Sequence, residues 1–264
     1  MKKTLTLLFA LSLATSASAE DAFSLTTGLD YSSGKYGNAT ATDMLYIPVT
    51  AKYAKDEWTL KLTVPYISVS GPGGVIRGMG RTDMMASASS GGGMGGGGSG
   101  GTATNTHSGL GDVIASAGHT MYSTTNLELD LVGNIKFGTA NANLGLGTGK
   151  NDYSMQLDSF YTISDSMLFT TLGYKKFGVP AGTSLNNIFY GSIGSSTTLD
   201  NDTTAGISMD MAQRTSTLGA NQVSASVFAS EKFASGFKVM ANIAKGFADG
   251  SPDFEMSLMV SKMY

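Results

Sequence analysis

Apolar and polar residues alternate one by one along most of the chain beyond residue 22, in segments of about ten residues. In the first segment Phe23, Leu25 and Leu29 share one parity, whereas Ser24 and Thr26 share the other. Successive side chains of a β-strand point to opposite faces, so this pattern predicts strands with one apolar and one polar face. Tight turns and longer polar loops separate the segments alternately. The twelve predicted strands are 23–32, 44–54, 58–66, 113–121, 127–137, 153–163, 167–177, 188–199, 204–211, 223–232, 238–247 and 254–264.

The last eleven residues show the alternation most clearly. Phe254, Met256 and Leu258 share the parity of the final residue, Tyr264, and only Lys262 interrupts this apolar face. A strand that ends on an aromatic residue is typical of bacterial outer-membrane β-barrels, where that side chain lies in the interfacial girdle. We expect the segment 254–264 to pair with 23–32, to close the barrel, and to be read by the barrel-assembly machinery. The alternative is the edge strand of a soluble sandwich.

The whole chain therefore predicts an all-β, transmembrane antiparallel barrel of about 12 strands. After the start of the chain, no apolar run is long enough for a membrane helix, and only helices and closed barrels satisfy every backbone group in lipid. An even number of strands places both termini on the periplasmic side, with tight turns there and long loops outside. The longest predicted extracellular loop, 71–108, contains a glycine-rich run at 91–101 that we expect to be mobile.

The first nineteen residues have the features of a secretory signal peptide. Lys2 and Lys3 precede an apolar stretch, and small residues at 16–19 offer a cleavage site before Glu20. The mature chain, 20–264, then carries 15 basic and 20 acidic residues, a balance that argues against nucleic acid as a partner. We expect export across the inner membrane of a Gram-negative bacterium, with outer-membrane lipid as the surrounding partner. The chain contains 0 cysteines, which excludes disulfides and thiolate metal sites.

Composition refines the prediction for the barrel interior. Charged residues make up 14% of the chain, whereas soluble domains have about 25%. Together with 35 glycines, this favours an apolar outer face and a mainly uncharged polar inner face. Parity is ambiguous in 167–177 and 188–199, where apolar residues occur at both odd and even positions.

A few charged residues nevertheless have inward parity. Facing lipid near the midplane, such groups would cost several kcal/mol each, so we predict that they face the lumen. Mixed signs on neighbouring strands are compatible both with guidance of solutes and with salt-bridged packing that fills a narrow barrel. The lumen-facing candidates are Asp30, Lys52, Lys61, Asp112, Glu128, Asp130, Lys136, Asp158 and Asp210, and the predicted aromatic girdle contains Tyr53, Trp58, Tyr66 and Tyr264.

Three central motifs, at 108–112 (SGLGD), 134–139 (NIKFGT) and 146–153 (LGTGKNDY), resemble a known family. They are similar to those of outer-membrane proteins assigned as transporters to the phenol meta-cleavage degradation pathway. The resemblance extends over most of the mature chain and departs from the family in the glycine-rich insertion and the shorter C-terminal half. It implies a barrel that passes small hydrophobic or aromatic molecules. Asp112, Lys136 and Asp158 lie in or beside the matching motifs.

Other motifs have simpler interpretations. Gly145 to Lys150 resembles a nucleotide-binding loop, but the following Asn151 and the absence of a βαβ pattern favour a flexible outer loop. His119 has lipid-facing parity near a periplasmic turn, which indicates an interfacial residue. His107, in the long loop, could form a weak rim pair with Asp112. The loop methionines lack regular ligand spacing, so we expect no metal and no cofactor.

Passive passage of a small solute, as through a porin-like channel, is the function that these features favour, and we expect no enzymatic activity. A first alternative is a closed structural or surface-interaction barrel without transport. A second is an outer-membrane hydrolase that uses His107 or His119.

Overall fold

A computed structural model describes residues 22–36, 39–71, 105–216 and 219–264. The predicted signal peptide, 1–19, lies outside these residues, as does most of the predicted long loop. The ends of that loop are strand: Gly71 belongs to β3, and 105–108 belong to β4. The described chain is all-β apart from one short 3-10 turn, η1 (Ala142–Leu144). It contains no helix long and apolar enough to cross a bilayer.

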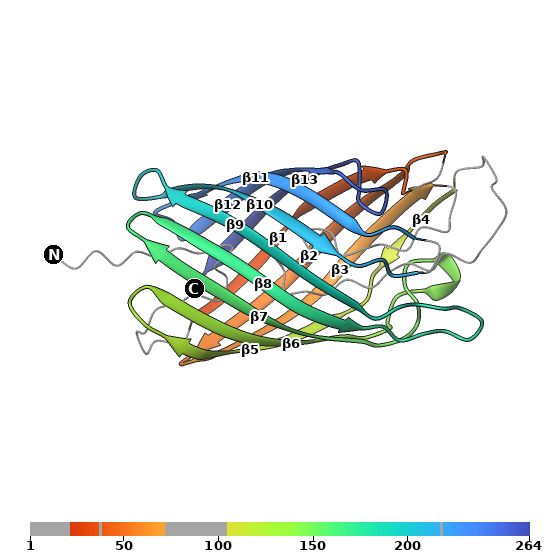
Figure 1. Ribbon diagram of the computed structural model, residues 1–264, viewed down its shortest axis with the longest axis horizontal. Coiled ribbons are helices and arrows are strands. Elements are labelled where there is room, and N and C mark those ends of the chain that lie inside the picture. The colour runs from red at the N-terminus through yellow and green to blue at the C-terminus, as the bar shows by residue number, and fades with distance from the viewer. Residues whose placement is uncertain (1–21, 37–38, 72–104, 217–218) are drawn as a thin grey trace.

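The strands form one closed antiparallel sheet (Figure 1). Within the described chain every strand pairs with at least two others except β4, which pairs with β3 alone. The pairing of β1 with β13 closes the ring, which has twelve positions because β4 and β5 share one. The strands are β1 (Ala22–Gly34), β2 (Thr42–Lys55), β3 (Trp58–Gly71), β4 (Asn105–Leu110), β5 (Ile114–Ser123), β6 (Leu127–Lys136), β7 (Asp152–Ile163), β8 (Ser166–Lys176), β9 (Ile188–Thr198), β10 (Thr203–Ala212), β11 (Gln222–Lys232), β12 (Phe237–Gly246) and β13 (Phe254–Met263). The predicted twelve-stranded barrel is confirmed.

The closing pair has the predicted partners. Ser24 lies opposite Met263 and Ser33 lies opposite Phe254, so the two strands match over ten residue pairs. The ladder continues one residue further, because the backbone N–H of Tyr264 donates to the carbonyl of Phe23 at 2.9 Å. The pairing of β1 with β13 removes the two edges that an open sheet would otherwise expose to lipid.

One strand position is split in two. β4 and β5 both pair with β3, and the intervening residues 111–113 leave the ladder. The break lies opposite Pro65, which has no N–H to donate and accepts only one bond, from the N–H of Gly111 at 2.8 Å. On its other side Pro65 faces Pro48 of β2. The ladder is therefore weakest around Pro65, and the bent segment turns Asp112 into the barrel.

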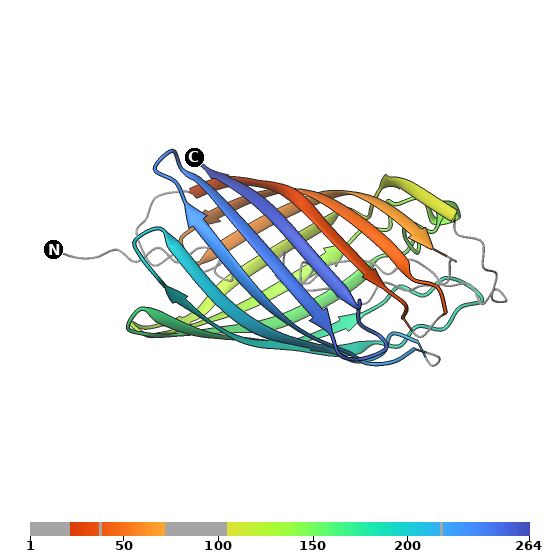
Figure 2. The same cartoon turned by 90° about the horizontal axis from the view of Figure 1, so that it is seen from above.

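Short turns occupy one end of the barrel and longer connections the other. The first strand begins and the last strand ends at the short-turn end (Figures 1 and 2). We call this the periplasmic end, following the expectation from the even number of strands, and the other the extracellular end. The turn at Asp200 shows how compact these connections are. Its carboxylate accepts bonds from the backbone N–H groups of Asp202 (2.9 Å) and Thr203 (2.8 Å), which lower the pKa of Asp200 below its usual value.

The outer surface is apolar, with aromatic side chains near both ends. Tyr53, Trp58, Tyr66 and Tyr264 all have exposed side chains on the outward parity. Further exposed aromatics lie near the periplasmic ends at Phe23, Tyr122, Tyr161, Phe233 and Phe237, and near the extracellular ends at Phe137, Tyr153, Tyr174, Phe189, Phe247 and Phe254. Two aromatic belts of this kind are typical of barrels embedded in a bilayer.

The residue that interrupted the terminal pattern, Lys262, also points outward. Its ammonium donates to the carbonyl of Ser235 in the neighbouring turn and lies 4.7 Å from the ring centre of Phe237 and 6.0 Å from that of Tyr264. The charge thus reaches the periplasmic rim while the aliphatic stem follows the wall.

Candidate functional site

A buried ion network lies inside the barrel near its extracellular end. The ammonium of Lys136 is 2.6 Å from Asp112 and 3.2 Å from Asp152, and that of Lys175 is 3.9 Å from Asp152. All four side chains are at most 4% exposed. Charges this deeply buried are stable only when paired and hydrogen-bonded, so the network must remain complete.

The network holds two extracellular loops against the barrel. Asp112 accepts a bond from the backbone N–H of Ala140 at 2.8 Å, and Asp152 accepts one from the N–H of Gly178 at 2.9 Å. Ala140 belongs to the loop after β6, and Gly178 to the loop after β8. The same carboxylates therefore neutralise the lysines and fix the start of both loops.

The loop after β6 contains the glycine motif that we expected to form a flexible outer loop, and it is instead packed. Leu146 and Thr148 are buried, and Asn141 caps η1 by accepting a bond from the N–H of Asn143 at 3.0 Å. Gly145 ends η1 in the left-handed region with φ 69°, a conformation that glycine adopts without strain. The glycines of this motif therefore allow the loop to fold back on itself.

Deeper in the barrel, one side of the inner wall carries charges of both signs. Lys52 on β2 and Lys61 on β3 lie directly opposite each other, and Asp130 on β6 lies opposite Asp158 on β7. Each like-charged pair would be unfavourable alone. Lys61 interacts electrostatically with both Asp130 and Asp158, and Lys52 with Asp130 and Glu128. We call Lys52, Lys61, Glu128, Asp130 and Asp158 the charged strip.

A chain of hydrogen bonds extends the charged strip toward β9. Asp158 accepts from Thr171 at 2.6 Å and from the amide of Gln156 at 2.9 Å and 2.8 Å. Gln156 in turn accepts from the hydroxyl of Tyr190 at 2.9 Å. Tyr190 packs in a buried apolar cluster with Phe177 and Ile188, so the polar chain ends against hydrophobic side chains.

Large apolar side chains interrupt the polar inner wall on β7, β8 and β11 to β13. The inner face there is otherwise mainly uncharged and polar, as expected, with buried Ser196, Ser208, Ser226, Ser230, Asn242 and Ser257. Six large apolar side chains share the same inward parity. They are Phe160, Met167, Phe169, Phe228, Met240 and Met259. The rings of Phe169 and Phe228 lie 6.2 Å apart, a distance at which aromatic pairs attract. We call this set the aromatic wall.

Two glycines make room for the aromatic wall. A Cβ at Gly194 would lie 2.3 Å from the ring of Phe169, and one at Gly206 would lie 2.4 Å from the ring of Phe228. The absence of a side chain lets each ring lie flat against the neighbouring backbone. In the ring of strands, Phe228 on β11 lies across the barrel axis from the charged strip, with Met240 and Met259 on the next two strands. Phe160, Met167 and Phe169 lie on β7 and β8, beside the strip.

Eight of the nine predicted lumen residues have inward strand parity, and the ninth, Asp112, is buried between β4 and β5. Asp30 is buried on β1, opposite Ser257 of β13 and Tyr46 of β2. The structure brings Asp112 and Lys136 together in the ion network and gathers five others in the charged strip. Asp210 lies apart from both groups and lines a small cavity with Glu255. Sequence reasoning missed Asp152, one residue before its predicted strand, and Lys175, in a segment of ambiguous parity.

Neither histidine has the surroundings of a catalytic base. His119 points outward and packs edge-on against Trp58, with 4.5 Å between ring centres, which makes it part of the periplasmic aromatic belt. His107 lies in β4 opposite Val69. The predicted partner of His107, Asp112, contacts Lys136 and Ala140 instead.

Comparison with known proteins identifies the fold. No family model matches the chain, and no curated protein matches it. Among solved structures, it is similar to an outer-membrane channel from Pseudomonas putida F1, with a TM-score of 0.67, 13% identity, and coverage of 94% of this chain and 97% of that one. The NanC porin matches with a TM-score of 0.55, 8% identity and coverage of 90% and 97%. The KdgM porin matches with a TM-score of 0.51, 12% identity and coverage of 90% and 98%.

Proposed function

We propose that this protein is a passive outer-membrane channel for small solutes that combine an aromatic or other apolar part with a charged group. The observation that carries this proposal is an interior that combines the charged strip with the large apolar side chains of the aromatic wall, of which Phe228 on β11 lies across the barrel axis from the strip. A solute with one apolar and one ionised side can contact both surfaces at once, and each supplies what the other lacks.

The fold supports passage through the barrel. The three similar solved structures named above are described as a channel and two porins, and their likeness to this chain concerns the barrel architecture. The sequence resemblance to transporters of the phenol meta-cleavage pathway points to aromatic solutes, which agrees with Phe169 and Phe228 on the inner wall.

The interior is suited to guiding solutes rather than to binding them tightly. The charged strip offers two lysines and three carboxylates, so ionised solutes of either sign find a counter-charge. Conduction requires contacts that are favourable at entry and weak enough for exit. Shallow apolar contacts along the aromatic wall, together with spread rather than convergent charges, meet that requirement.

Liposomes that contain the purified protein test this proposal. Aromatic solutes with a permanent charge cross lipid very slowly unaided, so we would compare uptake of an aromatic sulfonate and an aromatic quaternary ammonium with uptake of a sugar of similar size. We expect all three to enter, with the aromatic solutes favoured over the sugar. In Phe169→Ser and Phe228→Ser we expect this preference to fall while the sugar still enters.

Absence of uptake for every solute would overturn the channel and favour the closed barrel. Equal preferences in the wild-type protein and both serine variants would retain a channel but remove the role of the aromatic wall. A matched substitution on the lipid-facing side of the same strand, Leu168→Ser, controls for general damage to β8, because Leu168 is exposed on the outer surface.

A further inference from the structure

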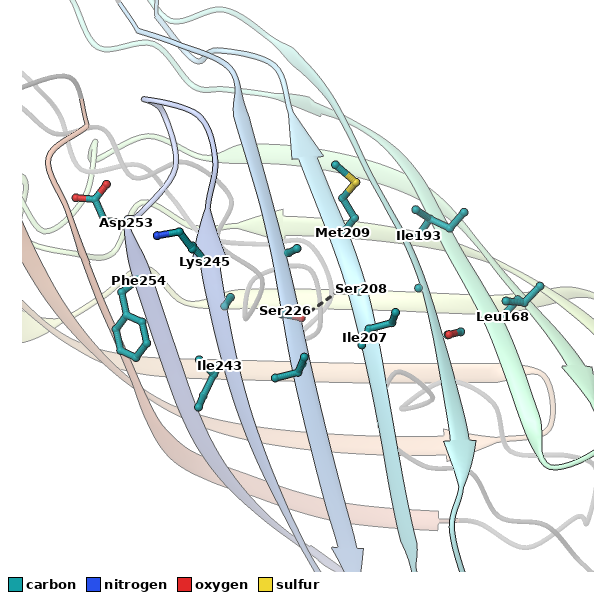
Figure 3. A pocket seen from close by; sticks show the side chains of 15 residues that line it. Leu168, Ile193, Ile207, Ser208, Met209, Ser226, Ile243, Lys245, Asp253 and Phe254 are labelled. Atoms are coloured by element: carbon teal, nitrogen blue, oxygen red, sulfur yellow. Dashed lines mark hydrogen bonds between the residues drawn. The ribbon is translucent and has the colours of Figure 1, made fainter.

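An apolar groove runs along the outer wall across β8 to β13, away from the barrel interior. It has a volume of about 920 Å³, comparable with pockets that hold small ligands. Figure 3 shows its lining side chains, among them Ile207, Ile243 and Phe254, with Lys245 and Asp253 at one end.

The groove arises because small residues interrupt two rows of large ones. In one row Ala225 lies between Met209 and Lys245 on neighbouring strands. In the next row Ser195 lies between Leu168 and Ile207. Each gap lowers the surface between bulky neighbours. Both gaps line the same groove, on either side of Ile207 and Met209 of β10.

The surface beside this depression is also low. Ala205, Ala229 and Ala241 lie side by side on β10, β11 and β12 and all point outward. A flexible hydrocarbon chain can therefore follow the wall from the groove toward the middle of the membrane, gaining contacts on its sides as well as beneath it.

A cation lies where the groove reaches the extracellular aromatic belt. Lys245 has outward parity and is in register with Phe254, a member of that belt. A lysine on the lipid-facing side is tolerated at this depth because its ammonium can reach the headgroup layer. The carboxylate of Asp253, at the same end, accepts a bond from the backbone N–H of Lys35 at 3.2 Å.

We propose that this groove binds an anionic lipid of the outer leaflet whose headgroup is a phosphate monoester, with an acyl chain along Ala225 and Ser195 and the phosphate monoester on Lys245. The choice of lipid follows from the groove's position on the membrane-facing wall, its apolar lining and the positive charge at its headgroup end. The site is separate from the solute path, since its large side chains point away from the lumen.

The absence of cysteine from the chain allows a direct test. Ala225→Cys is labelled with a small fluorophore, and the protein is reconstituted with brominated lipids of identical chains that carry either a phosphate monoester or a phosphocholine headgroup. We expect the phosphate lipid to quench with about fivefold higher apparent affinity, the ratio expected for one lysine near an anionic headgroup. The same label at Leu62→Cys, on the opposite wall, should show no preference.

Adding Lys245→Gln to the labelled protein should abolish the preference. Equal quenching by both lipids at Ala225, or a preference that persists in the Lys245→Gln background, would overturn the site. Formation of disulfide-linked dimers through Ala225→Cys in the bilayer would also overturn it, because a second copy would then cover the groove. Val227→Cys, in the adjacent row of the groove, serves as the reporter if Ala225→Cys does not insert.

Discussion

At the scale of single residues, the stability of the barrel interior depends on a few buried charged side chains whose loss no neighbouring residue can compensate. Lys136 is the centre of the buried ion network, because it contacts both Asp112 and Asp152. Lys175 reaches only Asp152, and at a longer distance. Loss of Lys136 would therefore leave Asp112 buried without its cation.

We expect Lys136→Met to destabilise the barrel by about 3–5 kcal/mol, the usual cost of breaking a buried ion pair from one side. Urea unfolding of the protein in lipid vesicles measures the change in free energy. Lys150→Met, in the exposed part of the loop after β6, is the matched control and should change stability little. A loss below about 1 kcal/mol for Lys136→Met would show that the network is not needed for stability.

A second prediction concerns the packing of the glycines beneath the aromatic wall. Gly194→Ala places a methyl group 2.3 Å from the ring of Phe169 and 2.5 Å from the backbone carbonyl oxygen of Ile207, so we expect a loss of about 1–3 kcal/mol from overpacking. At Gly133, by contrast, the nearest heavy atom would be 4.0 Å away, and Gly133→Ala should be neutral or slightly stabilising.

The same unfolding measurement distinguishes packing from a general intolerance of alanine. Shortening the ring in the double variant Gly194→Ala with Phe169→Leu should recover part of the lost stability. Equal effects of Gly194→Ala and Gly133→Ala would contradict the proposed contact.

At the scale of elements, alternation predicted strands well wherever only one parity was apolar. The closing strand and its partner, β13 and β1, matched the prediction because their inward residues are mostly small or polar. β4 was missed, since Asn105 to Leu110 contains a single large apolar residue and resembles a polar loop. Its strand conformation comes from pairing with β3, a long-range contact that no local pattern reveals.

The aromatic wall was missed for two reasons. In β8 apolar residues occupy both parities, so Phe169 could not be separated from the lipid-facing set. In β11 Phe228 is a single large apolar residue on the parity of three serines, too weak a signal to predict an apolar surface. Their inward direction follows from register with neighbouring strands, which pairing around the whole ring determines.

We expect loss of the last residue of the terminal strand to affect assembly of the barrel rather than the stability of the assembled barrel. Tyr264 adds one backbone bond to Phe23 and a ring contact with it, with 5.9 Å between ring centres, and its side chain is 70% exposed. We therefore expect deletion of Tyr264 to reduce the amount of folded barrel in cell membranes. The unfolding free energy of refolded protein should change little.

Heat-dependent gel mobility of membrane fractions measures the folded barrel in cells. Tyr264→Phe keeps the terminal aromatic ring and is expected to assemble normally. Wild-type levels of the deletion variant would show that the assembly machinery does not depend on this residue.

At the scale of the whole molecule, the arrangement of charges around the ring should control ion selectivity. Lys61 is a buried cation that interacts with the carboxylates of Asp130 and Asp158. The other lysine of the charged strip, Lys52, lies directly opposite it on β2. We expect Lys61→Met to shift the reversal potential in a salt gradient toward cation selectivity. Asp158→Asn should shift it toward anion selectivity, because the same local balance is changed in the other direction.

The two variants remove opposite charges from the same part of the wall, so each is a control for the other. A substitution at the headgroup level of the outer wall, Lys245→Gln, should leave the reversal potential unchanged. Shifts of the same sign in Lys61→Met and Asp158→Asn would mean that the charged strip does not line the ion path.

Current through single molecules in a planar lipid bilayer shows directly whether the barrel conducts. If the barrel is a passive channel, the purified protein should give discrete conductance steps that grow with salt concentration and need no energy source. An aromatic solute should interrupt the current more often than a sugar of the same size. A bilayer that contains folded protein yet shows no conductance at any voltage would contradict the account and indicate a closed barrel.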